Sequence, residues 1–217
     1  MEPEDNHYNQ LSLFVNQEVN SRHQAKIFTL PGAEICMYYN FFDENESNEI
    51  FATLYQSVKW EQRYIALYGR KVALPRLVSW YGDQGKLYKY SGIEMRPNPW
   101  TQLLIQIKNR IEKVCDYTFN SVLLNLYRDG SDSIAWHSDD EKELGQNPLI
   151  ASVSFGETRL FKLRHKLQKE LKLNLQLSHG DLLIMGGTTQ SYWQHQISKN
   201  HDSRQPRINL TFRKILS

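Results

Sequence analysis

The sequence has few cysteines and no long apolar run. Only two of its 217 residues are cysteines, Cys36 and Cys115, and each lies in an apolar stretch. Two distant cysteines predict reduced, buried thiols and not a disulfide framework. No run approaches the roughly 20 apolar residues of a membrane-spanning helix, and the acidic N-terminus lacks the apolar segment of a secretory signal. We therefore expect a soluble, intracellular protein, cytoplasmic or, in a eukaryote, nuclear.

A large excess of charge of one sign is also missing. The 26 Lys and Arg residues nearly balance the 24 Asp and Glu residues, which leaves a net charge of +2. Bulk charge therefore indicates no partner, and binding to nucleic acid would need a local basic patch. The length fits one domain. We expect a polar, loosely ordered N-terminus over residues 1–26 and a single domain over residues 27–217.

Helical and extended patterns divide the chain near its middle. Apolar residues recur with the helical period over 43–58 and 100–115, and residues 64–80 are typical of a hairpin. After residue 118 short β-prone segments predict strands over 121–127, 150–155, 159–164, 171–177, 182–185 and 207–215. Many short strands separated by turns are typical of a sandwich or jelly roll. We therefore expect a mainly β fold with flanking helices, whose core follows an N-terminal α/β extension.

A candidate metal site begins with His137 and Asp139, which are two residues apart. On an extended segment such side chains point the same way, and His195, after a glycine-rich turn, is the best third ligand. Two imidazoles and one carboxylate leave half of an octahedron open, as in non-heme iron(II) oxygenases. The same set also suits catalytic zinc. Alone, a His-x-Asp pair is a weak signal, because a solvated loop histidine has the same pattern.

Three other histidines are weaker candidates for the third ligand. His165 lies in a basic run and is expected to be solvated, His179 precedes Gly-Asp and is expected in a turn, and His201 lies in a polar segment. We therefore prefer His195.

Polar residues alternate strictly with apolar ones over residues 207–213, RINLTFR. Arg207, Asn209, Thr211 and Arg213 share one face of this predicted strand. An edge strand with a solvated polar face is one interpretation. The other is a carboxylate-binding site, since Arg offers planar, bidentate hydrogen bonding. A 2-oxo dicarboxylic acid would need both a metal ion and such an arginine.

These motifs occur in a familiar order. Asn125-x-Tyr127, His137-x-Asp139, His195 and the 207–213 strand together resemble the AlkB family of nucleic-acid dealkylases. The resemblance covers about residues 60–217. Segments such as PRLVSWYGD (75–83), FNSVLLNLYRDGSDSIAWHSDDE (119–141) and IASVSFG (150–156) are similar to the eukaryotic AlkB homologues 2 and 3 in particular.

The resemblance implies a double-stranded β-helix, or jelly roll, over 119–217, and a nucleotide-recognition extension over 27–118. The iron(II) ligands it implies are His137, Asp139 and His195. The 2-oxoglutarate contacts it implies are Asn125, Tyr127, Arg207, Asn209, Thr211 and Arg213. The base pocket it implies comprises Tyr88, Tyr90, Asp140 and Glu141, with His137 as a further wall. The nucleic-acid contacts that we expect are Tyr68, Gly69, Arg70 and Arg76.

Tyr68 lies at the tip of the predicted hairpin. There, homologue 2 carries an apolar-aromatic-glycine finger that fills the gap left by a flipped base. Tyr68 differs from that finger by a hydroxyl group. A surface tyrosine at a hairpin tip is the alternative interpretation.

The implied activity is direct reversal of base alkylation. Iron(II), 2-oxoglutarate and O2 would demethylate bases of the 1-methyladenine and 3-methylcytosine type, with release of succinate, CO2 and formaldehyde. The base must leave the helix or come from a single strand, and Asp140 and Glu141 suit a cationic lesion. We expect alkylated DNA, single- or double-stranded, or RNA as partner, no membrane partner, and a monomer. Two alternatives remain, a hydroxylase of a protein or small molecule and a non-catalytic nucleic-acid-binding module.

Overall fold

The computed structural model describes residues 25–67, 69–84, 88–90, 93–95 and 97–216, without the side chains of 67, 88–90 and 93–95. Its large sheet contains β1 (Ala25–Leu30), β2 (Ala33–Tyr38), β3 (Glu61–Leu67), β4 (Arg70–Gly82), β7 (Ser121–Tyr127), β9 (Ile150–Gly156), β12 (Leu182–Gly186) and β14 (Arg207–Arg213). Its small sheet contains β8 (Ile134–His137), β10 (Arg159–His165), β11 (Lys172–Leu177) and β13 (Trp193–Ile197). A separate ribbon pairs β5 (Tyr88–Tyr90) with β6 (Ile93–Met95).

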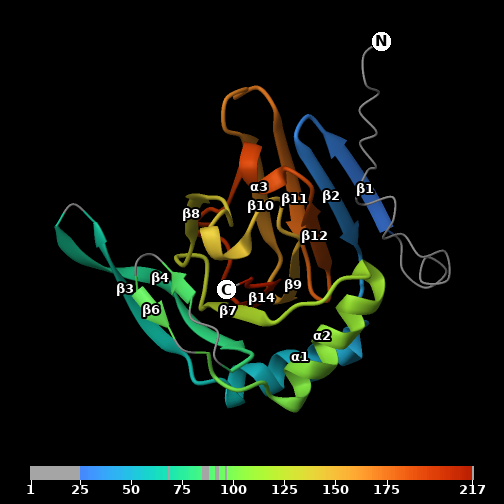
Figure 1. Cartoon of the computed structure of the whole chain (residues 1–217). Coiled ribbons are helices and arrows are strands. Elements are labelled where there is room, and N and C mark those ends of the chain that lie inside the picture. Colours follow the sequence, from blue (N-terminus) through green and yellow to red (C-terminus); the bar gives the residue numbers. More distant parts are fainter. Residues whose placement is uncertain (1–24, 68, 85–87, 91–92, 96, 217) are drawn as a thin grey trace, which may run out of the picture.

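The large and small sheets pack face to face, and their strands pair antiparallel (Figure 1). The strand order is β1-β2-β12-β9-β14-β7-β4-β3 in the large sheet and β11-β10-β13-β8 in the small sheet. Apolar side chains of both sheets meet between them, among them Leu123, Phe161, Met185 and Trp193. These two facing sheets are the mainly β core that the sequence predicts.

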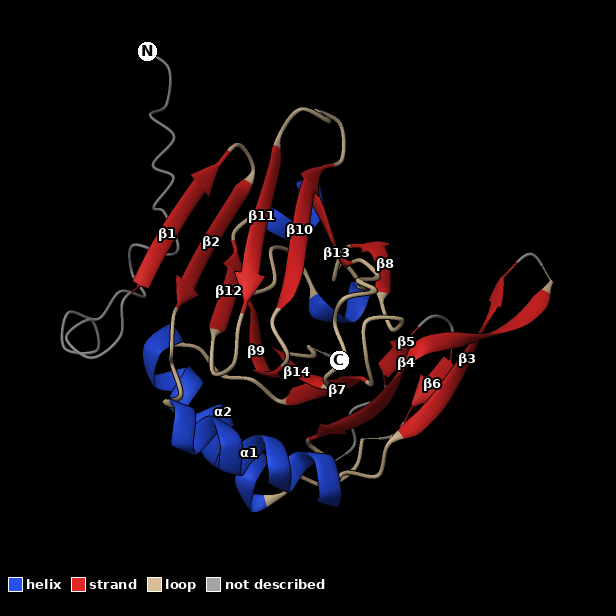
Figure 2. Ribbon diagram, turned by 180° about the vertical axis from the view of Figure 1, so that it is seen from behind, coloured by secondary structure: helices blue, strands red, loops and turns tan. Residues whose placement is uncertain are grey.

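Two helices, α1 (Glu44–Ser57) and α2 (Gln102–Cys115), cover the outer face of the large sheet (Figures 1 and 2). Leu104 and Ile107 of α2 pack in one cluster with Leu210 and Phe212 of β14. The large sheet is therefore buried on both faces, and the predicted position of the helices outside the sheet is confirmed.

Capping residues explain where the helices begin. Asp43 accepts a hydrogen bond from the backbone of Glu46, whose side chain bonds back to the Asp43 N–H in a capping box. Thr101 accepts a bond from the Leu104 N–H. Such caps satisfy N–H groups that have no partner within the helix. Both predicted helices are confirmed, with ends that differ by at most two residues.

The predicted hairpin is β3–β4, and it reaches away from the packed sheets (Figure 1). Gly69 has a φ of +74°, a backbone conformation that favours glycine. The base of β4 pairs with β7, which continues the large sheet into the hairpin.

Several short elements are absent from the sequence prediction, among them β8, β13 and the four-residue helix α3 (Thr189–Tyr192). They are too short to show a reliable period. The first strand, β1, begins at Ala25, two residues before the expected start of the domain. Within the described residues, no helix combines the length and apolar character needed to cross a bilayer.

Candidate metal and 2-oxoglutarate site

His137 and His195 lie opposite each other on β8 and β13 of the small sheet. Their ring centroids are 4.3 Å apart. Asp139 follows two residues after His137, beyond the end of β8. One ligand atom from each of the three residues lies within 4.8 Å of the others. The structure thus brings the predicted triad together, in a geometry that suits one metal ion.

The hydrogen bonding of His137 fixes which nitrogen can bind a metal. Its Nδ1 lies 2.8 Å from the carbonyl oxygen of Ala135. A carbonyl only accepts, so Nδ1 carries the proton and Nε2 keeps its lone pair. Nε2 lies 4.0 Å from an oxygen of Asp139. A histidine held through its other nitrogen in this way is typical of metal sites.

Asp139 is buried and forms an ion pair with Arg213, whose Nη2 donates to Oδ1 at 2.8 Å. Burial alone would raise the pKa of Asp139, but Arg213 and the two histidines outweigh it and hold the pKa at about 2. Burial, with a contribution from His137, lowers the pKa of His195 to about 3. At neutral pH both groups are therefore in the deprotonated forms that bind metal ions.

A cavity of about 470 Å³, including space open to solvent, lies between the sheets. The nine residues predicted to bind metal and 2-oxoglutarate all line it: His137, Asp139 and His195, together with Asn125, Tyr127, Arg207, Asn209, Thr211 and Arg213. Strand alternation explains this convergence, because the polar face of β14 points inward and its apolar face packs against the helices. The edge-strand interpretation of 207–213 is excluded, since β14 lies between β9 and β7.

Arg207 is the clearest sign that this cavity takes an anionic ligand. The residue is buried, and its Nη2 donates to Ser154 Oγ at 2.9 Å. Among the described residues, none accepts a hydrogen bond from its buried Nε or Nη1. Burial lowers the pKa of Arg207 to about 10, against the opposing effect of nearby Tyr127, so the group stays charged at neutral pH. Unpaired buried donors are costly, and a carboxylate would satisfy them.

The remaining polar side chains of the cavity are bonded to the protein. Asn209 donates to Ser152 Oγ at 2.8 Å and accepts from Thr211 at 3.0 Å. Asn125 accepts from Arg76 Nε at 2.8 Å. These bonds hold the cavity wall in place. Direct contact of these side chains with 2-oxoglutarate stays a prediction.

A second cavity, of about 1210 Å³ including space open to solvent, adjoins the first. His137 lines both cavities, and side chains of β3 and β4 form part of the second. Glu141 lines it as well, and its buried Oε2 has no hydrogen-bond partner among the described residues. Asp140 is exposed and pairs with Lys166 at 3.2 Å. Of the two predicted base-recognition acids, Glu141 is the one that faces this cavity.

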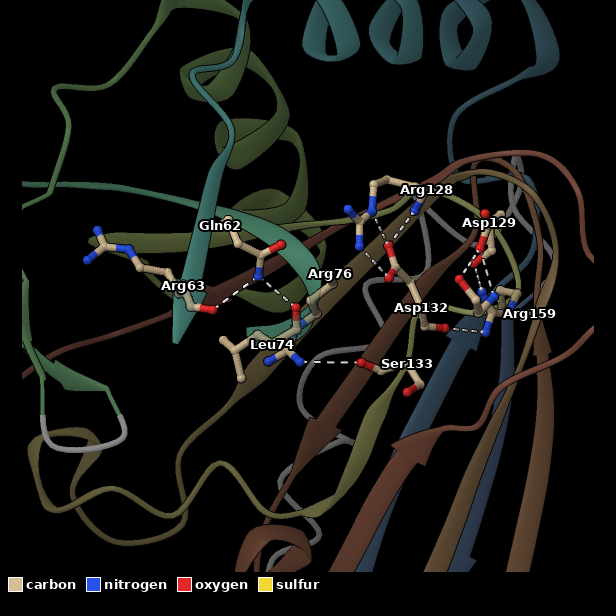
Figure 3. Close-up of polar contacts among 10 residues, drawn as sticks. Gln62, Arg63, Leu74, Arg76, Arg128, Asp129, Asp132, Ser133 and Arg159 are labelled. Atoms are coloured by element: carbon tan, nitrogen blue, oxygen red, sulfur yellow. Dashed lines mark hydrogen bonds and ion pairs between the residues drawn. The ribbon is translucent and has the colours of Figure 1, made fainter. Parts of the chain in front are cut away.

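Arg76 does not lie where a phosphate contact requires. It is 2% exposed, and besides Asn125 it bonds the Ser133 carbonyl at 3.4 Å (Figure 3). The same loop is held from its other side by Arg159, which donates to the carbonyl of Asp132 at 2.9 Å. The expectation that Arg76 contacts phosphate is therefore corrected. The residue ties the hairpin to β7 and to the loop that leads into β8.

The other predicted nucleic-acid and base contacts are described only in part. Tyr68 lies outside the described residues. Tyr88 and Tyr90 form β5 through their backbone, and their side chains lie outside the described part. Gly69 and Arg70 are exposed at the end of the hairpin. Their roles stay predictions.

The rival histidines lie away from the triad. His165 is buried, contrary to its expected solvation, because its Nδ1 accepts from the backbone N–H groups of Leu167 and Gln168 at the β10–β11 turn. His179 lies in a turn, as expected, and accepts from the Gly156 N–H at 2.8 Å. His201 is exposed.

Sequence analysis missed two neighbours of the site. Phe161 stacks on His195 with ring centroids 5.1 Å apart, and Ser154 is the partner of Arg207. Alternation within β9 and β10 indicates that both residues face inward, but only the pairing of the strands shows which residues they meet.

Comparison with known proteins agrees with this fold and site. The 2OG-Fe(II) oxygenase superfamily matches residues 34–213. The alpha-ketoglutarate-dependent dioxygenase alkB homolog 3 of Homo sapiens is 46% identical over 192 residues, which are 84% of this chain and 66% of that protein. The DNA oxidative demethylase ALKBH2 of Mus musculus is 40% identical over 191 residues, which are 83% of this chain and 80% of that protein. The chain therefore belongs to the 2OG-Fe(II) oxygenase superfamily and, within it, to the AlkB homologues.

Solved structures support the fold alone. The structure of OsALKBH1 has a TM-score of 0.61 at 16% identity and covers 87% of this chain and 100% of that one. A prolyl hydroxylase from Trichoplax adhaerens has a TM-score of 0.59 at 14% identity, with 95% and 90% covered. The predicted jelly-roll core is confirmed. The chain spans about two thirds of the length of its homolog 3 relatives, 66% for the human protein.

Proposed function

We propose that this protein is an iron(II)- and 2-oxoglutarate-dependent dioxygenase that removes N-alkyl groups from bases of DNA or RNA. The observation that carries the proposal is Arg207. Two nitrogens of its buried guanidinium, Nε and Nη1, have no acceptor among the described residues, and the group lies in the same cavity as the His137–Asp139–His195 cluster. A metal ion at one end and an unsatisfied cation at the other fit a 2-oxo dicarboxylate.

Each part of the cavity has a role in this proposal. The two histidines and Asp139 would hold iron(II), and Arg207 would bind the distal carboxylate of 2-oxoglutarate. Arg213 keeps Asp139 charged and oriented through its 2.8 Å bond. When bound, iron(II) and 2-oxoglutarate supply the O2-dependent oxidising power of the reaction. Apolar residues around the ligands, such as Phe161, limit access of water.

The second cavity would take the alkylated base. It shares His137 with the metal cavity, so a base held there lies beside the oxidising centre. Glu141 offers a carboxylate oxygen that has no partner among the described residues. This oxygen suits the positive charge that methylation places on the pairing edge of adenine or cytosine. Opposite charges attract far more strongly in a dry pocket than in water. The relatives named as a dioxygenase and as a DNA oxidative demethylase support this substrate class.

The reaction balances in two stages. One O2 and one 2-oxoglutarate convert N–CH3 to N–CH2OH, while 2-oxoglutarate becomes succinate and CO2. The C–N bond of the N–CH2OH group then breaks. Its electron pair stays on the ring nitrogen, which loses its positive charge, and the hydroxyl proton is released as formaldehyde leaves. The net result is an unmodified base.

The test is an activity panel on oligonucleotides that carry 1-methyladenine or 3-methylcytosine, as single- and double-stranded DNA and as RNA. In the presence of iron(II), 2-oxoglutarate and O2, we expect one formaldehyde and one succinate for each methyl group lost. No loss of methyl groups from any member of the panel would overturn the proposal. Turnover of 2-oxoglutarate stimulated only by a protein or a small molecule would instead support the hydroxylase alternative.

A further inference from the structure

We propose that Gln190 is a positioning residue for the metal site. Its side-chain oxygen holds the backbone of Asp139, so that the Asp139 carboxylate meets His137 and His195. The inference rests on the metal site proposed above, and it concerns a residue that does not itself line the metal cavity.

The need for such a residue follows from where β8 ends. The strand stops at His137, and residues 138–141 have no regular structure. The buried N–H of Asp139 therefore has no partner in a β-ladder, although buried N–H groups need one. Gln190 Oε1 accepts from this N–H at 2.9 Å. Both residues are buried, at 3% and 1% exposure.

Asp139 is thus held at two points. Arg213, from the large sheet, fixes its carboxylate, and Gln190, beside the small sheet, fixes its backbone. With only the first contact, the ligand could follow the arginine away from the histidines. With both, the carboxylate direction and the position of its Cα are set before a metal binds.

The residues on either side of Asp139 are tied to the same segment. Ser138 Oγ donates to the carbonyl of Trp193 at 2.8 Å. Lys166 Nζ contacts Asp140 at 3.2 Å and donates to the backbone carbonyl of Gln190 at 2.9 Å. Residues 190–193 lead directly into the third ligand on β13. The contacts therefore join the two segments that carry all three ligands.

The position of Gln190 is itself fixed. It lies on α3, whose first residue, Thr189, donates to the Gly186 carbonyl at 2.5 Å and accepts from the Glu34 N–H of β2 at 3.0 Å. The amide nitrogen of Gln190 lies 3.7 Å from the sulfur of Met185. Both polar atoms of the Gln190 amide therefore have a partner.

The chain offers a matched control four residues away. Gln194 is partly buried, and its Oε1 accepts from Arg164 Nη2 at 3.1 Å on the other side of the sheet. Gln194→Met and Gln190→Met remove the same amide and keep a similar side-chain volume, but only the second removes the acceptor of the Asp139 N–H.

The experiment is an anaerobic titration of the full chain with Mn(II), followed without substrate or turnover. Removing the partner that orients a metal ligand costs about 10–100-fold in metal affinity. We expect at least tenfold weaker binding by Gln190→Met and binding within twofold of the unchanged chain by Gln194→Met. Equal affinities for the two variants would overturn the inference. Failure of the unchanged chain to bind Mn(II) would overturn the proposed metal site and the inference with it.

A third variant separates positioning from folding. Gln190→Glu keeps an oxygen acceptor at the same place, so we expect it to bind Mn(II) within threefold of the unchanged chain, even if Gln190→Met does not fold. Tenfold weaker binding by Gln190→Glu would show that the acceptor is not what matters. The visible charge-transfer band of the iron(II)–2-oxoglutarate complex, recorded without O2, should likewise be kept by Gln190→Glu and lost or shifted in Gln190→Met.

Discussion

Arg207 and Arg213 share one face of one strand, yet the structure gives them different tasks. Arg213 pairs with Asp139 at the metal end of the cavity. Arg207 lies at the far end of β14, bonded to Ser154 and with two donors left over among the described residues. The sequence pattern does not distinguish the two arginines. Their partners in the structure do: Arg213 orients a metal ligand, and Arg207 is free to bind a carboxylate.

Arg207→Met should weaken 2-oxoglutarate binding by on the order of 100-fold, about 3 kcal/mol, because two charge-assisted hydrogen bonds are lost. Arg207→Lys should restore only part of this, since an ammonium group cannot replace the planar fork. Calorimetric titration of the Mn(II)-loaded protein measures both, with Arg204→Met at an exposed position as the control. Comparable losses in DNA binding and in 2-oxoglutarate binding would contradict the assigned role.

At the scale of elements, the β3–β4 hairpin has a fixed base and an exposed end. Gln62 Nε2 bonds the Leu74 carbonyl at 2.8 Å beside an irregularity in the β3–β4 pairing (Figure 3). Arg76 then joins β4 to Asn125 and Ser133. These contacts fix the lower part of the hairpin against β7 and the loop before β8, and the hairpin lines the second cavity through Ile65 and residues 74–76.

Tyr68→Ala should lower repair of double-stranded methylated DNA by at least tenfold more than repair of single strands. The reason is that an inserted aromatic side chain offsets the stacking lost when a base leaves a duplex. Tyr64→Ala is the control on the same hairpin, since Tyr64 is 42% exposed with Lys71 over its ring. Initial rates on matched substrates measure the ratio. Equal losses on both kinds of substrate would remove the argument for a finger.

At the scale of the whole molecule, stability and chemistry use opposite faces of one sheet. Leu210 and Phe212 of β14 pack beneath the helices, while Asn209 and Thr211 line the metal cavity. Among the described residues, the apolar cluster beneath the helices includes none of the residues that line the metal cavity. The apolar face packs in a continuous core and stabilises the sheet. The sheet can therefore hold buried polar groups on its other face.

Leu210→Ala should lower the free energy of unfolding by about 2–5 kcal/mol, because it leaves a cavity at a fully buried position. Leu167→Ala, at a position 81% exposed, should change it by less than about 0.5 kcal/mol. Urea unfolding measures both. We also expect the folded Leu210→Ala protein to keep its Mn(II) affinity; a large loss would mean that the two faces are not independent.

Much of the fold follows from local patterns. The helical period predicts α1 and α2, and β-prone segments predict most strands of the large sheet and two of the four strands of the small sheet. The prediction fails for β8, β13 and α3, which are four or five residues long. It also fails for His165 and Arg76, whose burial depends on acceptors and donors that lie elsewhere in the chain.

The sequence by itself indicated candidate metal and carboxylate-binding residues, because a His-x-Asp pair, a later histidine and an alternating Arg strand have the residue types and spacing that such ligands require. Their roles stay predictions. The tertiary structure decided how these residues are held. Pairing of β8 with β13 sets the two histidines face to face, and burial leaves Arg207 with donors for a ligand. Gln190 meets Asp139 across 51 residues of chain. Such contacts depend on which strands become neighbours, and no local pattern carries that information.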